Sequence, residues 1–161
     1  MYNDVIEAIK TGLSGDFIHS DPKSILKDLT PAIARKNVPP YDHSTWDLLY
    51  HTVIWNDIFL SNIKGSIANW NPENNWPSEG DKANDQNFHD LIKRFEENLE
   101  EVYFLLHSDK IDFTKKQKIS TTNTAELTVI KLFITILQHI SYHIGQIACV
   151  RKIVDDWPPS G

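Results

Sequence analysis

The stretch LQHISYHIGQIACVRK, residues 137–152, decides the fold, because its apolar residues recur at the spacing of a buried α-helix. Two histidines, His139 and His143, stand four positions apart within this apolar run. Residues four apart on a helix lie about 40° apart around its axis and one turn along it, so both rings share one face. The other residues of that face are apolar: Leu132, Ile136, Ile147 and Val150. The pattern therefore predicts a long helix that points two imidazole rings into a protein core.

The same apolar periodicity predicts three more helices along the chain. The four expected helices span residues 3–14, 44–63, 88–106 and about 124–154. Gly15 is a typical stop signal for the first helix, and Asn123 or Thr124 is the expected cap of the last. The second helix opens with S-T-W-D, a capping box in which Ser44 and Asp47 satisfy free backbone donors. These signals predict an all-α protein.

The segments between these helices are polar, and two of them are long. A short helix or irregular connection is expected from Pro22, which follows a capping residue, to the pair Pro39 and Pro40. Residues 69–87 are rich in Asn, Pro, Asp and Gly, as is typical of a long crossover loop. Residues 111–121 are compatible with a short extended segment, but the sequence shows no convincing partner strand. The expected architecture is one four-helix bundle domain over residues 1–161.

Composition and charge exclude several classes of function. The 161 residues include 16 Lys and Arg against 22 Asp and Glu, a net charge of −6, with no basic patch of the kind that binds nucleic acid. The single cysteine, Cys149, excludes an internal disulfide, and the first residues lack the pattern of a signal peptide. The longest apolar run, residues 127–154, is interrupted by too many polar side chains for a membrane span. We therefore expect a cytoplasmic protein without nucleic-acid or membrane partners.

Two inward histidines on one helix face favour a metal site. A single buried histidine is commonly satisfied by a carbonyl or carboxylate, but two unpaired imidazoles would cost a few kcal/mol. A divalent ion removes that cost, since neutral imidazole is its commonest nitrogen ligand. Position 140 is Ile, so the H-E-x-x-H chemistry of zinc peptidases is excluded. His51, between Leu48 and Trp55 in the second long helix, is the natural third ligand. Three nitrogens suit Zn²⁺ or Ni²⁺ and leave a position for water or substrate.

Four further side chains are predicted to surround this site. Gln146 and Tyr142 lie near the histidines on the last helix and are candidates to hydrogen-bond the metal ligands. Trp46, Trp55 and Tyr142 are expected to line the path by which a substrate enters between the helices.

Two other residues have competing interpretations. Asp47 precedes His51 by four positions and either orients that ring or serves only as the acid of the capping box. Cys149 lies about 120° around the helix from His143, so it is not expected to bind the same ion. Its expected role is that of a small buried apolar residue.

Several motifs together resemble one family of proteins. The segments S-T-W-D-L-L-Y-H, N-W-P, Q-H-I-S-Y-H-I-G-Q-I with a following R-K, and W-P-P are similar to those of the DinB/YfiT-like family of helical bundles. The resemblance implies an up-down-down-up four-helix bundle, often dimeric, with a divalent metal on His51, His139 and His143. Family members of known activity include thiol-dependent S-transferases and a mycothiol-dependent maleylpyruvate isomerase. It thus implies a small-molecule substrate and a low-molecular-weight thiol as partners.

Three functional hypotheses follow from the residues and the resemblance together. The first is a metal-dependent transferase or hydrolase in which an external thiol or water attacks the substrate, because the chain itself shows no convincing nucleophile or general base. The second is a bundle that binds a metal or small ligand without catalysis. The third is a structural or dimerising bundle without metal, whose inward histidines are ordinary core residues.

Overall fold

A computed structural model describes residues 2–16, 19–121 and 125–157 of the chain. The long helices are α1 (Asn3–Ser14), α4 (Thr45–Ile63), α6 (Asp85–Leu106) and α7 (Val129–Ile153). The shorter elements are α2 (Pro22–Leu26), α3 (Pro31–Ala34), the 3-10 helix η1 (Pro72–Asn75), α5 (Glu79–Lys82), β1 (Lys116–Lys118) and β2 (Glu126–Thr128). The prediction of an all-α bundle is confirmed.

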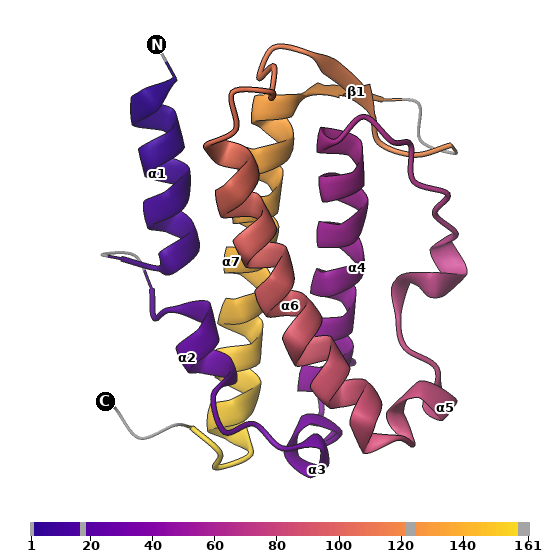
Figure 1. Cartoon of the computed structure of the whole chain (residues 1–161). Coiled ribbons are helices and arrows are strands. Elements are labelled where there is room, and N and C mark those ends of the chain that lie inside the picture. The colour runs from indigo at the N-terminus through magenta and orange to yellow at the C-terminus, as the bar shows by residue number, and fades with distance from the viewer. Residues whose placement is uncertain (1, 17–18, 122–124, 158–161) are drawn as a thin grey trace.

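The four long helices follow the predicted topology. In Figure 1, α1 and α7 run from the top of the bundle to the bottom, whereas α4 and α6 run from the bottom to the top. Because α4 and α6 point the same way, residues 64–84 return along the right-hand side of the bundle as a long crossover. This is the up-down-down-up arrangement that the sequence resemblance implied.

The core is built around α7, which packs most extensively against α4 and also against α1. Its residues Leu132, Ile136 and Ile147 are fully buried, as predicted for the apolar face that they share with the two histidines. A helix that packs against two others buries a broad apolar face, while positions such as Lys131, Gln138 and Tyr142 stay exposed on its outer side. This packing holds the middle of α7 against the middle of α4.

The predicted start and stop signals act as expected. Gly15 ends α1 with a left-handed φ of 84°, a conformation that glycine adopts without steric cost. At the start of α4 the Ser44 side chain accepts from the backbone N–H of Asp47, and the Asp47 carboxylate accepts from the backbone N–H of Ser44 at 2.9 Å. The capping box therefore fixes the direction in which α4 leaves the loop.

The start predicted for the last helix is wrong. The proposed caps Asn123 and Thr124 lie outside the described residues, and α7 begins only at Val129. Residues 126–128 instead form β2, which pairs antiparallel with β1 in the register Lys116 to Thr128. The hairpin supplies what a side-chain cap would: the Val129 N–H donates to the carbonyl of Lys115 at 2.9 Å.

The crossover is more ordered than its composition suggested. It contains η1, where Asn71 caps the N-terminus, and α5, where Ser78 and Asp81 form a second capping box. The helix predicted to begin at residue 88 begins at Asp85. Local caps thus bend the crossover into short turns that lie against α4.

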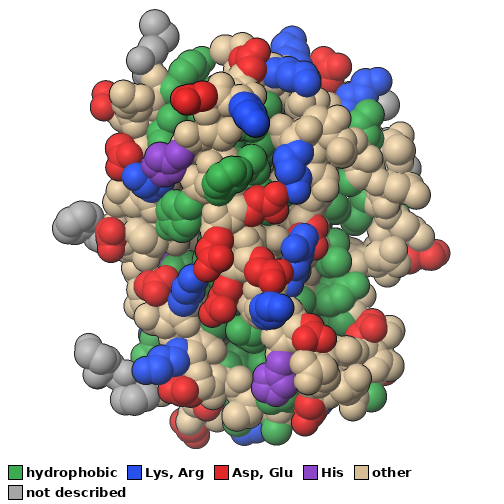
Figure 2. Space-filling view, viewed as in Figure 1, with side chains coloured by type: hydrophobic (Ala, Val, Ile, Leu, Met, Phe, Trp, Pro, Cys, Tyr) green, Lys and Arg blue, Asp and Glu red, His purple; other side chains and the backbone are tan. Residues whose placement is uncertain are grey.

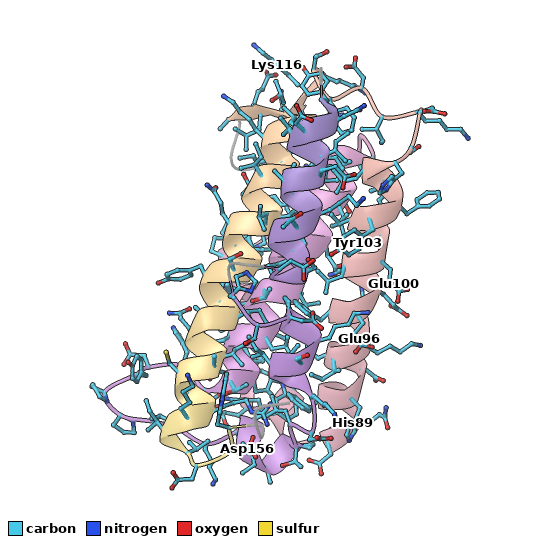
Figure 3. The ribbon with its side chains drawn as sticks, turned by 90° about the vertical axis from the view of Figure 1, so that its left-hand side faces the viewer. His89, Glu96, Glu100, Tyr103, Lys116 and Asp156 are labelled. Atoms are coloured by element: carbon cyan, nitrogen blue, oxygen red, sulfur yellow. The ribbon has the colours of Figure 1, made fainter. Side chains whose placement is uncertain are left out.

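The outer face of α6 is rich in glutamate and solvated. Figure 2 shows acidic and basic side chains interspersed over this face, and Figure 3 places Glu96 and Glu100 on the outer edge of α6. Within the described part of the chain, no helix has the length and apolar character needed to cross a membrane.

Candidate metal centre

Three histidine rings meet where α4 and α7 pack against each other. His51 comes from the middle of α4, and His139 and His143 come from successive turns of α7. The His139 Nε2 atom lies 3.2 Å from Nε2 of His51 and 3.1 Å from Nε2 of His143. Their ligand atoms all lie within 4.8 Å of one another, so the cluster can hold one metal ion. The structure brings together the three residues that the sequence had singled out.

Hydrogen bonds at the far side of two rings fix which nitrogen carries the proton. His143 Nδ1 lies 2.7 Å from Gln146 Oε1, an acceptor, so Nδ1 is the protonated nitrogen of this ring. His51 Nδ1 lies 3.4 Å from the backbone carbonyl of Asn75, a longer contact of the same kind. Both rings therefore turn an Nε2 lone pair toward His139, which is the tautomer that a metal ligand requires.

Hydrogen bonds within the cluster do not satisfy His139. His139 Nε2 faces two lone pairs and has at most one proton to donate, and its buried Nδ1 has no hydrogen-bond partner. Two nitrogens bound tetrahedrally to one Zn²⁺ at about 2.0–2.1 Å are about 3.3 Å apart, close to the two separations measured from His139 Nε2. The donor set and its spacing thus fit a divalent metal ion.

Burial keeps the three rings neutral at physiological pH. Burial, and then repulsion from His143 and His51, lowers the pKa of His139 to about 3. Burial also lowers the pKa of His143 to about 4, against the opposing effect of its hydrogen bond to Gln146. The pKa of His51 is lowered for the same reason, chiefly by burial. Neutral imidazole is the form that binds metal, so no proton has to be displaced first.

An open cavity of about 440 Å³ adjoins the cluster. His51 and His139 form part of its wall, and the remaining lining residues are Trp55, Phe59, Trp70, Pro72 and Asn75. A ligand in this cavity would therefore lie beside two of the three proposed metal ligands.

The crossover covers one side of the site. The Asn75 side-chain oxygen accepts from the indole N–H of Trp55 at 2.9 Å, in addition to the backbone contact with His51. The Trp76 ring stacks on His51, with the ring centroids 4.6 Å apart. The His43 ring also stacks on Trp76, with the centroids 3.7 Å apart. These contacts fix the orientation of the His51 ring from outside the helix bundle.

Only one of the two tryptophans predicted at the entry is there. Trp55 lines the cavity, but Trp46 is not among its lining residues. Trp46 is 1% exposed and packs against Phe88 of α6, with the Arg35 guanidinium 4.8 Å above its ring. Trp46 stands five positions before His51, which places it about 140° around the helix from that ring, and so it faces α6 instead of α7.

Asp47 serves the capping box, one of its two alternative roles. One of its carboxylate oxygens accepts from the Ser44 hydroxyl at 2.6 Å, and the other lies 3.3 Å from Lys82 Nζ. These two partners occupy the carboxylate, and the group that contacts His51 Nδ1 is the carbonyl of Asn75.

The predicted residues on α7 separate into two groups. Gln146 contacts His143 directly and also donates to the Tyr142 hydroxyl at 3.4 Å, whereas Tyr142 is 64% exposed and does not line the cavity.

Cys149 is exposed, contrary to the expectation of a buried residue, because it falls on the outer side of α7. It does not belong to the histidine cluster.

The sequence interpretation missed the contributions of the crossover. Asn75, Trp76 and Trp70 reach the site from residues 69–87, whose composition predicts only a crossover loop. One signal was present: residues 69–87 contain two tryptophans, Trp70 and Trp76, among small polar residues, and large aromatic side chains in a polar loop usually contact something.

Comparison with known families agrees with the fold and the cluster. The sequence model of the DinB superfamily matches residues 21–147, which is more than half of the chain and includes all three histidines. The chain belongs to the DinB superfamily. No curated protein sequence matches it. The family and the three-histidine cluster together fit a metal-binding protein.

Proposed function

We propose that this DinB superfamily member is a divalent-metal-dependent enzyme that either transfers a thiol to a small electrophile or hydrolyses that electrophile. The observation that carries the proposal is the convergence of three neutral imidazole nitrogens beside an open cavity. Three protein ligands leave a coordination position for another molecule, whereas structural zinc sites are commonly closed by four protein ligands. His51, His139 and His143 are the proposed ligands, and Zn²⁺ or Ni²⁺ is the proposed ion.

A bound divalent ion supplies the activation of the nucleophile, since it lowers the pKa of a thiol or water and polarises a substrate oxygen. The groups of the protein around the site position the three histidine rings and fix their tautomers. Gln146 holds the proton on Nδ1 of His143, and the Asn75 carbonyl does so for His51. Both contacts keep the Nε2 lone pairs directed at the shared centre.

Among the described residues, neither the histidine cluster nor the cavity lining includes a carboxylate or a thiol, which favours an external nucleophile. A thiol that loses its proton on binding needs no protein base, whereas activation of water is usually assisted by one. Thiol transfer is therefore the first reaction to test.

The test is a thiol-consumption assay with untagged protein. Zinc-loaded and nickel-loaded wild type, chelator-treated wild type and His139→Ala are each mixed with small thiols and a panel of activated electrophiles. We expect thiol loss only with the loaded wild type, and full activity in the control His89→Ala, which changes an exposed histidine of α6. Equal rates in the loaded wild type and His139→Ala would reject catalysis at this site.

The same lack of a protein base supports a second candidate, a bundle that binds a metal or a small ligand without turnover. It predicts metal-dependent stability and ligand binding, but no product with any thiol or electrophile. A chelator-sensitive melting temperature together with a consistently negative assay would favour this candidate over the enzyme.

A further inference from the structure

Aromatic side chains continue the cavity wall directly beyond the histidines. His51, Trp55 and Phe59 stand four positions apart on α4, so they lie on one face of the helix in successive turns. The centroid of the Trp55 ring lies 6.3 Å from that of His51 and 6.4 Å from that of His139. The aromatic part of the wall therefore begins beside two of the proposed metal ligands.

The three aromatic side chains of this wall form one group of contacting rings. The Trp55 ring lies 5.1 Å from the Trp70 ring and 5.4 Å from the Phe59 ring, measured between centroids, and both pairs are tilted. The indole N–H of Trp55 donates to the side-chain oxygen of Asn75 at 2.9 Å, which fixes the orientation of the central ring. Tilted rings present both faces and edges, so a planar aromatic ligand gains specific ring contacts in addition to the apolar area that it buries.

The wall itself offers few polar contacts and carries no charge. Asn75 is a polar residue of the lining, but its side-chain oxygen accepts from Trp55 and its backbone carbonyl accepts from His51. None of the described residues that line the cavity is Asp, Glu, Lys or Arg. The wall thus selects a ligand by shape and apolar contact, whereas a divalent ion on the histidines would anchor a neutral or an anionic oxygen alike.

We propose that this cavity selects small molecules in which a planar aromatic ring stands next to the oxygen that binds the metal ion, with the ring against Trp55, Phe59 and Trp70. The volume of about 440 Å³ is within the range of about 300–1,000 Å³ for small-molecule sites. The inference rests on the proposed function, because it takes the histidines to hold the ion and the bound molecule to be the electrophilic substrate.

The probes share one metal-binding group and differ only in what is attached to it. Acetohydroxamate, cyclohexanecarbohydroxamate and benzohydroxamate carry a methyl group, a puckered saturated ring and a planar aromatic ring. Each is titrated calorimetrically into zinc-loaded, untagged full-length protein, and the zinc content is measured before and after the titration. Because the hydroxamate group is constant, the ratios of the three affinities report on the cavity wall.

We expect benzohydroxamate to bind most tightly and acetohydroxamate most weakly. The aromatic ring should bind roughly two- to tenfold more tightly than the saturated ring of similar size, as expected for one contact between aromatic rings. It should bind at least about tenfold more tightly than the methyl group, because it buries more apolar surface.

Trp55→Leu and Trp70→Leu each keep an apolar side chain but remove a ring from the wall. Both variants should lose most of the preference for the aromatic over the saturated ring. Their affinity for acetohydroxamate should stay as in wild type, which shows that the metal site is intact. The matched control Trp157→Leu, in the C-terminal segment outside the cavity lining, should keep the wild-type ratios.

Equal binding of the aromatic and the saturated ring in wild type would overturn the inference, as would a preference that survives unchanged in both Trp55→Leu and Trp70→Leu. The comparison in wild type decides this even where a variant does not fold. Zinc uptake with acetohydroxamate binding but without an aromatic preference would overturn the ligand class alone. Protein that takes up no zinc, or takes it up and binds no hydroxamate, would contradict the proposed function as well, because it would have no open coordination position.

Discussion

At the scale of single residues, the histidine cluster depends on the side chains that hold its tautomers. Gln146 stands three positions after His143, on the next turn of α7, and its oxygen accepts from Nδ1 at 2.7 Å. This contact is within reach of sequence reasoning, because the helix geometry that aligned His139 with His143 also brings Gln146 to the same rim. The contacts from Asn75 and Trp76 are not, since no local rule specifies where a loop residue 24 positions from His51 will lie.

Gln146→Leu should weaken metal binding by about 10- to 100-fold, because the His143 tautomer loses its acceptor. Gln146→Glu retains an acceptor oxygen and should bind at least as tightly as wild type. Competition with a chromophoric chelator measures both affinities, with Gln138→Leu as a control at an exposed position of the same helix. Unchanged affinity in Gln146→Leu would show that this contact does not support the site.

The metal-free protein should lose stability as the pH falls below about 6.5. The pKa values of His139 and His143 lie near 3 and 4 in the folded chain, below the usual histidine value, so the unfolded chain takes up protons first. Stability is therefore fully present above pH 6.5 and decreases toward pH 4, by up to about 1.4 kcal/mol per pH unit for each proton taken up. Urea unfolding between pH 7.5 and 4.5 measures the slope, which should be smaller in His139→Gln. An equal slope in that variant would contradict burial as the cause.

At the scale of elements, helix ends were predictable where a local signal determines them. Gly15, the Ser44 box and the sequence around Pro22 each act through neighbours within four positions, and the structure has all three. The start of α7 was not predictable in this way. Residues 126–128 become a strand only because residues 116–118 pair with them. That pairing depends on tertiary context, not on a signal within residues 126–128.

The crossover and the metal site should be coupled. The Asn75 carbonyl accepts from His51 Nδ1, and Trp76 stacks on the same ring, so a ligand on Nε2 of His51 stabilises both contacts. We expect added Zn²⁺ to slow amide hydrogen exchange in residues 73–76 by severalfold, with no change in the β1–β2 hairpin. The effect should be absent in His51→Ala. Slowing of the same size in that variant would show that zinc acts on the loop from elsewhere.

At the scale of the whole molecule, one buried arginine joins the end of α7 to the N-terminal segment. Arg151 is 1% exposed, pairs with Asp156 at 2.7 Å and donates to the backbone carbonyls of Ile25 and Lys27. Because α2 lies between α1 and α4 in the chain, this contact fixes the bottom of the bundle below the histidine cluster.

Arg151→Met should lower the free energy of unfolding by about 3 kcal/mol, because two carbonyls and a carboxylate lose their donor. Lys131→Met, at an exposed position of the same helix, should change it by less than about 0.5 kcal/mol. Urea unfolding of the two variants compares them directly. A loss of the same small size in both would mean that the arginine contacts are not needed for stability.

The central claim is that the three histidines hold one divalent metal ion. Elemental analysis of untagged wild type, His139→Ala and the surface control His89→Ala tests it most directly, before and after incubation with Zn²⁺ or Ni²⁺. The account predicts about one ion per chain in wild type and in His89→Ala, and almost none in His139→Ala. Wild type that remains free of metal after incubation with either ion would contradict it, and the three rings would then be residues of an ordinary core.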